Sequence, residues 1–136
     1  MNRSRAAAFV LAALSLAAPA GAAETHIVTQ QQFGFHPDDL TIQVGDTVQW
    51  VWSGGGHTVT NGVHPDSGGT GSLFDEPLNV ISPTFSFTFT SVGNVPYFCR
   101  PHFGGGMTGI VRVLGAVEVD EPATLSTFGK MKNLYR

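Results

Sequence analysis

The sequence contains a single cysteine, Cys99, among its 136 residues. One cysteine cannot form a disulfide within a chain, so an internal disulfide framework is excluded. In an oxidising compartment an unpaired thiol is buried and inert, paired with another chain, or bound to a metal. Composition by itself leaves these three alternatives open.

Charged residues are also scarce, at 12% of the chain, where soluble domains average about 25%. Glycine and proline are plentiful instead, with 17 and 8 residues. Such a turn-rich composition favours a small all-β protein over a helical bundle. The length allows one compact domain and argues against a multidomain enzyme.

No apolar run is long enough to cross a bilayer, which takes roughly 20 residues. The longest run, Ala6 to Ala18, is interrupted by Ser15, follows Arg3 and Arg5, and precedes the small residues 20–23. This pattern predicts a signal peptide over residues 1–23 rather than an N-terminal core helix. We therefore expect a protein without a transmembrane segment that is periplasmic or otherwise extracytoplasmic after cleavage.

Removal of that signal peptide takes two of the 7 basic residues and none of the 10 acidic ones, which leaves a net charge of 5 − 10 = −5. A negative chain is a poor ligand for nucleic acid or anionic lipid. The charge favours positively charged partners instead.

Short segments of alternating polarity predict the strands. In Thr84 to Thr90, three phenylalanines occupy one strand face, and this face requires a second sheet to cover it. Asn61 to Asn79 is rich in turn residues, and we expect a long surface excursion there. Seven or eight strands at this spacing predict an antiparallel β-sandwich. The other predicted strands lie within 25–33, 40–44, 47–52, 58–60, 95–99 and 108–114.

The sandwich domain is predicted to span residues 24–114, followed by a linker and short tail over 115–136. Apolar residues at three- to four-residue steps in 124–136 suggest a short amphipathic helix, with a disordered tail as the alternative. We hypothesise that this tail docks to a partner or a membrane surface, or serves as a sorting signal.

The residues with the most informative chemistry are Cys99, His102 and Met107, spaced C-x2-H-x4-M in a glycine-rich stretch. His57 follows an upstream strand and a Gly-rich loop, and it completes a set of two imidazoles, a thiolate and a thioether. Blue copper sites use this set, whereas zinc prefers a tetrahedral cage without a thioether. The remaining histidines, His26, His36 and His64, lack a companion at ligand spacing, and only His64 is a candidate for a second metal contact.

This ligand pattern, the Gly45-Asp46-Thr47-Val48-Gln49-Trp50 stretch and His57-Thr58-Val59 together resemble the cupredoxins, most closely plastocyanin and pseudoazurin. The resemblance implies an eight-stranded Greek-key sandwich. It also implies one type 1 copper ion held by His57, Cys99 and His102, with Met107 as the axial ligand. The implied activity is that of an electron carrier, not an enzyme. A c-type cytochrome or a copper or haem oxidoreductase is the expected partner, and the carrier is expected to be a monomer.

Thr58 departs from this pattern, because plastocyanins commonly have Asn after the first ligand histidine. The threonine hydroxyl can make a related bond between the two ligand loops. Around His102, the uncharged stretch that contains Pro101 and Phe103 predicts an apolar collar through which electrons pass.

Three other functions stay open from the sequence. A copper carrier or buffer would bind the metal without electron transfer. A domain of a copper oxidase or nitrite reductase would require further copper sites, and the chain has no His-x-His pair. A structural or adhesive sandwich would bind no copper.

Overall fold

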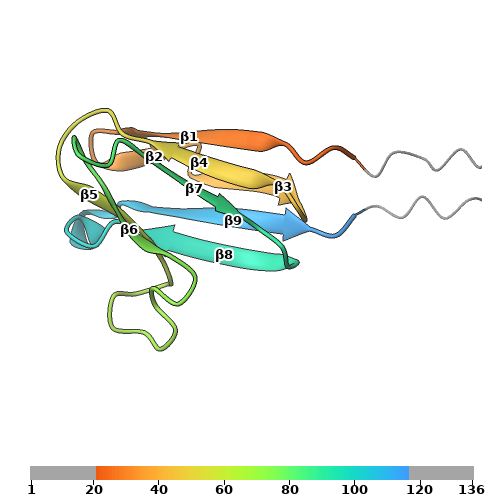
Figure 1. Cartoon of the computed structure of the whole chain (residues 1–136). Coiled ribbons are helices and arrows are strands. Elements are labelled where there is room, and N and C mark those ends of the chain that lie inside the picture. Colours follow the sequence, from red (N-terminus) through yellow and green to blue (C-terminus); the bar gives the residue numbers. More distant parts are fainter. Residues whose placement is uncertain (1–20, 117–136) are drawn as a thin grey trace, which may run out of the picture.

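A computed structural model describes residues 21–116, and these residues form two β-sheets packed face to face (Figure 1). Residues 117–136 of the predicted linker and tail, and residues 1–20 of the predicted signal peptide, lie outside the described residues. No helix in this part of the chain is long and apolar enough to cross a membrane. The expected two-layer β-sandwich is confirmed.

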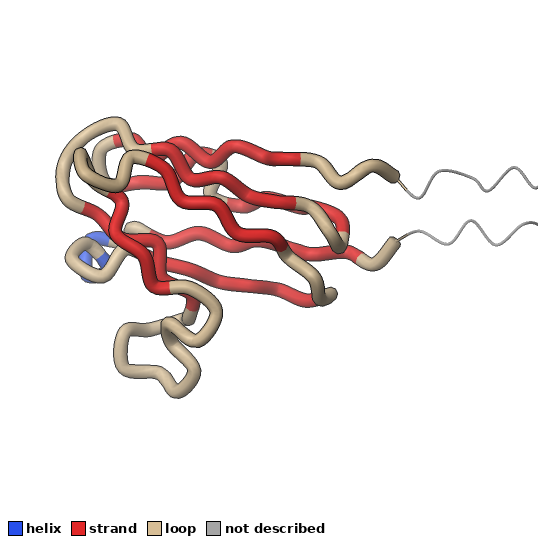
Figure 2. The backbone as a smooth tube through the Cα atoms, viewed as in Figure 1, coloured by secondary structure: helices blue, strands red, loops and turns tan. Residues whose placement is uncertain are grey.

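The first sheet has four strands and the second has five (Figure 2). The first has the order β2 (Gly34–His36), β1 (Thr25–Gln31), β4 (Thr47–Val51) and β7 (Thr84–Thr88). The second has the order β3 (Asp39–Gln43), β9 (Thr108–Leu114), β8 (Gly93–Phe98), β5 (His57–Asn61) and β6 (Asp75–Leu78). A 3-10 turn, η1, covers Phe103–Gly105.

Two features of the sheets differ from the expectation. The pairs β1–β4 and β3–β9 are parallel, while every other pairing among the described strands is antiparallel. Residues 21–116 form nine strands, and two of them, β2 and β6, lie outside the segments that the sequence predicts as strands. Gln32 takes a positive φ of 49°, and the chain reverses there so that the short β2 pairs back onto β1.

Trp50 lies at the centre of the core and is fully buried between the sheets. Its ring packs against Phe85 from β7 at 5.5 Å and against Tyr97 from β8 at 5.3 Å. Phe87 packs on Phe74 at 5.0 Å in the same core. The phenylalanine face of β7 is therefore covered by the second sheet, as its alternation predicts.

The prediction of a surface excursion from Asn61 to Asn79 is wrong for the last residues of this segment. Asp75–Leu78 forms β6, which pairs with β5, and both Phe74 and Leu78 are buried. The side-chain oxygen of Asn61 accepts the backbone N–H groups of Leu73 and Phe74 at 2.8 and 2.9 Å, which turns the segment back into the core. Only two apolar residues of this stretch face inward, too few to give a periodic signal.

Candidate metal centre

The four predicted ligands come from segments at the same end of the sandwich, opposite the start of β1 and the end of β9 (Figure 1). His57 is the first residue of β5. Cys99 directly follows β8, His102 directly precedes η1, and Met107 directly precedes β9. His57 and the short loop of residues 99–107 therefore meet where β5, β8 and β9 lie next to one another in the second sheet.

Backbone hydrogen bonds close the loop that carries three of these residues. The Cys99 N–H donates to the Met107 carbonyl at 3.0 Å, and the Met107 N–H donates to the His102 carbonyl at 3.3 Å. Gly106 ends η1 with a φ of 84°, a left-handed conformation that favours glycine. The loop thus folds back on itself with fixed ends, and the side chains of Cys99 and Met107 are fully buried.

Three possible metal-binding atoms converge at the site. The Nδ1 atoms of His57 and His102 are 3.1 Å apart, and the Cys99 Sγ lies 3.6 and 3.4 Å from them. Nitrogen and sulfur ligands that bind one ion at roughly 2.0–2.3 Å lie about 3.5–4 Å from one another around it. The triad is therefore close to the spacing that a single trigonally bound ion requires. Within the described residues, His57, Cys99 and His102 are the one cluster of this kind.

The surroundings of His57 leave its Nδ1 available to a metal. The Nε2 atom on the far side of the ring lies 3.0 Å from the Gly54 carbonyl, to which an Nε2–H donates. Such a bond fixes the tautomer in which Nδ1 carries the lone pair. A Cβ at Gly55 would approach the His57 Nε2 to 2.8 Å, so the glycine also leaves room for the ring.

Burial opposes charge on the ligands themselves. Desolvation raises the pKa of the Cys99 thiol, and desolvation followed by the neighbouring His102 lowers the pKa of His57. A thiolate in this place needs a cation beside it, which a bound metal supplies. The chemistry of the donors therefore fits a soft metal ion such as copper.

Gln30 is a site residue that the sequence did not indicate. Its side chain is fully buried in β1, and its Nε2 lies 3.1 Å from the His57 Nε2. The same amide donates to the Gln32 carbonyl at 2.8 Å and accepts the Ser53 N–H at 3.0 Å. Gln30 thus connects the β1–β2 turn with the loop before β5, and its side chain lies against the ring of His57.

Thr58 forms the expected connection between the two ligand loops. Its Oγ1 accepts the backbone N–H of Arg100 at 2.9 Å, and its own N–H points to the Cys99 Sγ at 3.4 Å. The hydroxyl therefore connects the strand that begins at His57 with the loop that begins at Cys99.

His102 is partly covered by aromatic side chains. The ring of Phe33, in the β1–β2 turn, packs edge-on against it at 4.9 Å, and 67% of Phe33 is exposed. Phe103 is half-buried beside it, and His64 packs edge-on against Phe103 at 5.0 Å. The apolar collar predicted from Pro101 and Phe103 thus includes Phe33, which is far away in sequence.

The other histidines are not in the metal cluster. His26 lies 2.9 Å from Asp46 at the far end of β1. The His64 Nδ1 accepts the Asp66 N–H at 3.1 Å in its own loop, so the structure gives no support for a second metal contact there.

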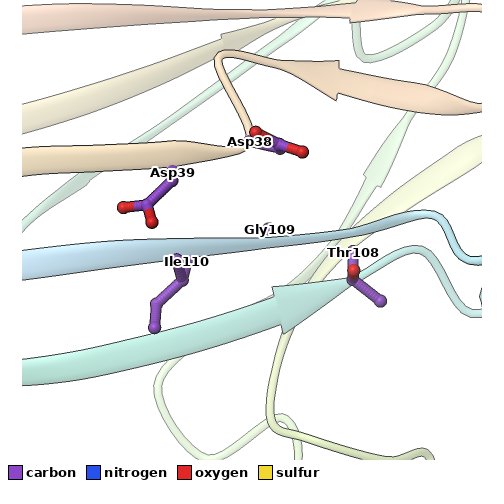
Figure 3. Close-up of a pocket in the computed structure, with 5 residues that line it drawn as sticks. All are labelled: Asp38, Asp39, Thr108, Gly109 and Ile110. Atoms are coloured by element: carbon purple, nitrogen blue, oxygen red, sulfur yellow. The ribbon is translucent and has the colours of Figure 1, made fainter.

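A separate hollow of about 370 Å³ lies along the seam of β3 and β9 (Figure 3). It is lined by Asp38, Asp39, Thr108, Gly109 and Ile110, none of which is a predicted ligand. The Asp39 carboxylate is already paired with Arg112 at 2.8 Å. The hollow is therefore distinct from the metal centre.

Comparison with known proteins gives relatives from one family of copper-binding proteins. A family model described as copper binding proteins, plastocyanin/azurin family, matches residues 22–114. A chloroplastic plastocyanin of Tetradesmus obliquus is 32% identical over 119 residues, which cover 81% of this chain and 79% of the relative. A plastocyanin of Synechococcus sp. (strain JA-2-3B'a(2-13)) is 34% identical over 125 residues, covering 77% and 84%.

Among solved structures, amicyanin from Paracoccus versutus superposes with a TM-score of 0.55 and 26% identity. The match covers 66% of this chain and 81% of that one. The sandwich fold is thus shared with this amicyanin.

Proposed function

The chain belongs to the plastocyanin/azurin family of copper-binding proteins, and on this premise we propose the ligands of its single type 1 copper site. His57, Cys99 and His102 would hold the ion through Nδ1, Sγ and Nδ1, and the thioether of Met107 would be the fourth ligand. The observation that supports this assignment is the convergence of the three donor atoms to within 3.1–3.6 Å of one another.

The protein is an electron carrier rather than an enzyme. When bound, copper supplies a one-electron couple between Cu(II) and Cu(I). The polypeptide holds the donors in place through its own contacts. The Cys99–Met107 backbone bond fixes the loop, the Gly54 carbonyl orients His57, and burial of Cys99 and Met107 keeps water away. A site held this rigidly suits a carrier, because little structure has to change with each electron.

We propose that electrons enter and leave through the His102 imidazole. This ring is half-buried, whereas His57 is 5% exposed, and Phe33 and Phe103 surround it with apolar surface. A transient redox partner docks on such a patch without losing hydration of charged groups. The partner is a redox protein, and we propose a c-type cytochrome or a copper or haem oxidoreductase.

The route is tested by Phe103→Glu. A buried carboxylate in the docking interface is expected to slow electron exchange with a c-type cytochrome about tenfold or more, since an unpaired charge costs at least 1–3 kcal/mol there. The visible spectrum of the copper should stay unchanged.

The matched control is Val92→Glu, which adds the same charge at a side chain that is 65% exposed near Gly115. It should alter the rate only slightly. Equal slowing by the two variants, or no slowing by Phe103→Glu, would mean that the partner docks elsewhere.

We also propose a cellular setting for the carrier. The composition of residues 1–23 supports export of the chain through a signal peptide. The domain of residues 24–114 then functions in the periplasm or another extracytoplasmic space. We propose that the carrier works there as a monomer, with residues 115–136 as a linker and tail.

A further inference from the structure

Four polar side chains form a ring of hydrogen bonds beside the metal centre. The guanidinium of Arg100 contacts both carboxylate oxygens of Asp75, at distances between 2.6 and 3.1 Å. Asp75 Oδ1 is 2.8 Å from the Thr60 hydroxyl, which is 3.0 Å from the Thr58 hydroxyl. The Thr58 oxygen accepts the Arg100 backbone N–H at 2.9 Å. The ring therefore starts and ends at Arg100, the residue after Cys99.

The chemistry of these groups fixes the direction of every bond. The Arg100 hydrogen bond lowers the pKa of Asp75, so its carboxylate is ionised at neutral pH and can only accept. The Thr60 hydroxyl must therefore donate to Asp75, and its oxygen is left to accept from Thr58. The Thr58 hydroxyl donates to Thr60, so its oxygen is free for the Arg100 N–H. Each bond in this chain polarises the next.

The ring reaches the residue whose backbone N–H contacts the Cys99 sulfur. The Thr58 N–H points to the Cys99 Sγ at 3.4 Å. Hydrogen bonds to the cysteine sulfur are among the interactions that set the redox potential of a copper–thiolate site, because they withdraw electron density from the sulfur. Loss of that contact favours Cu(II) over Cu(I) and lowers the potential.

We propose that Asp75, Thr60 and Arg100 are positioning residues of the metal centre, which hold the Thr58 N–H on the Cys99 sulfur through the Thr58 hydroxyl. The inference rests on the proposed role of Cys99 as a copper ligand. The ion pair is only partly buried, with side chains 40% and 38% exposed. Its effect is therefore on geometry at the sulfur more than on overall stability.

The cleanest test is Thr60→Val, because the substitution removes one hydroxyl from a fully buried side chain without changing charge or much volume. The equilibrium constant for reduction of the copper-loaded protein by a reference couple should fall roughly 3- to 10-fold, the net value of one hydrogen bond. In the copper-free protein, hydrogen exchange of the Thr58 amide should accelerate by a similar factor. Thr58→Val should act in the same direction, and Thr58→Ser, which keeps the oxygen, should restore both readouts.

Asp75→Asn separates positioning from simple electrostatics by the sign of its effect. Removing a negative charge near the copper would by itself favour Cu(I), whereas loosening the ring favours Cu(II). We expect reduction to become less favourable. Asp39→Asn is the matched control, since Asp39 makes an equivalent two-bond pair with Arg112 along β3 and β9, away from the ligand loop.

The proposal is overturned if Thr60→Val leaves both readouts at their wild-type values, or if Asp39→Asn and Asp75→Asn shift the reduction equilibrium alike. The amide exchange in the copper-free protein keeps the test valid if a variant binds copper poorly. If the wild-type protein shows no copper–thiolate band, the ligand assignment fails, which is a different outcome from unchanged variants of a blue protein.

Discussion

At the scale of single residues, the buried amide of Gln30 supports the metal centre from outside the ligand set. It is fully buried and makes contacts to the Gln32 carbonyl, the Ser53 N–H and the ring of His57. A buried amide is retained only where its polar atoms find partners. Here those partners belong to the two loops that flank the metal centre.

Replacing this amide by a hydrocarbon leaves the Ser53 N–H without its side-chain acceptor. Gln30→Leu should therefore lower the free energy of unfolding by about 1–3 kcal/mol. It should also weaken copper binding, because the Ser53 bond holds the loop whose Gly54 carbonyl orients the ring of His57. Urea unfolding of the copper-free protein and a copper titration measure the two effects.

Gln49→Leu is the comparison for Gln30, since Gln49 lies on the neighbouring β4, is only half-buried and makes a single bond to Ser86 at 3.3 Å. Gln49→Leu should lower the free energy of unfolding by less than about 0.5 kcal/mol. An equal loss of stability in the two variants would show that the bonds of Gln30 do not stabilise the loops around the metal centre.

The residue scale also shows what sequence reasoning could and could not find. Cys99, His102 and Met107 were predictable because they lie in one short loop whose residue types suit copper. Gln30 and Phe33 were not, since they reach the site through the pairing of β1 with β4 and through the turn at Gln32. The one sequence feature that relates to Gln30 is its spacing of two residues from Val28, which places both side chains on the inward face of β1. That face is known only after the strand has been placed in the sheet.

At the scale of elements, Asp46 joins the start of β1 to the turn between β3 and β4. Its carboxylate accepts the backbone N–H groups of Glu24 at 2.9 Å and Gln43 at 3.0 Å, and it lies 2.9 Å from the His26 ring. These bonds, the one from Glu24 first, lower the pKa of Asp46 from 3.8 to about 2. The turn therefore depends on an ionised carboxylate.

The sign of the pH dependence follows from this lowered pKa. The stabilisation is complete above about pH 3.8 and is lost as the pH falls toward 2, because protonation is easier in the unfolded chain. Asp46→Asn should cost about 1–3 kcal/mol at pH 5. The gap between wild type and variant should narrow in urea unfolding experiments at pH 3 and below. A gap that stayed constant with pH would show that the charge of Asp46 does not stabilise the turn.

Prediction of the elements succeeded where polarity alternates and failed where it does not. The three phenylalanines of Thr84 to Thr90 revealed a buried face, and β9 has the bounds that alternation indicates. β6 was missed because its burial depends on Asn61, whose side chain bonds to the backbone of residues 73 and 74. Such a contact has no local pattern in sequence.

At the scale of the whole molecule, the metal centre occupies one end of the sandwich. The converging ligands lie there under an apolar collar, and the start of β1 and the end of β9 lie at the opposite end. Both arginines of residues 21–116 are engaged in ion pairs, Arg100 with Asp75 and Arg112 with Asp39. The apolar collar therefore suits brief docking of a redox partner at the metal end.

The central claim is that Cys99 is the thiolate ligand of a type 1 copper, and a visible absorption spectrum tests it most directly. The purified protein is titrated with Cu(II) and then reduced, beside a Cys99→Ser variant and a His64→Ala control. We predict an intense blue band that bleaches on reduction, is absent from Cys99→Ser and is unchanged in His64→Ala. A colourless copper-treated protein, or a blue band that survives in Cys99→Ser, would contradict the account.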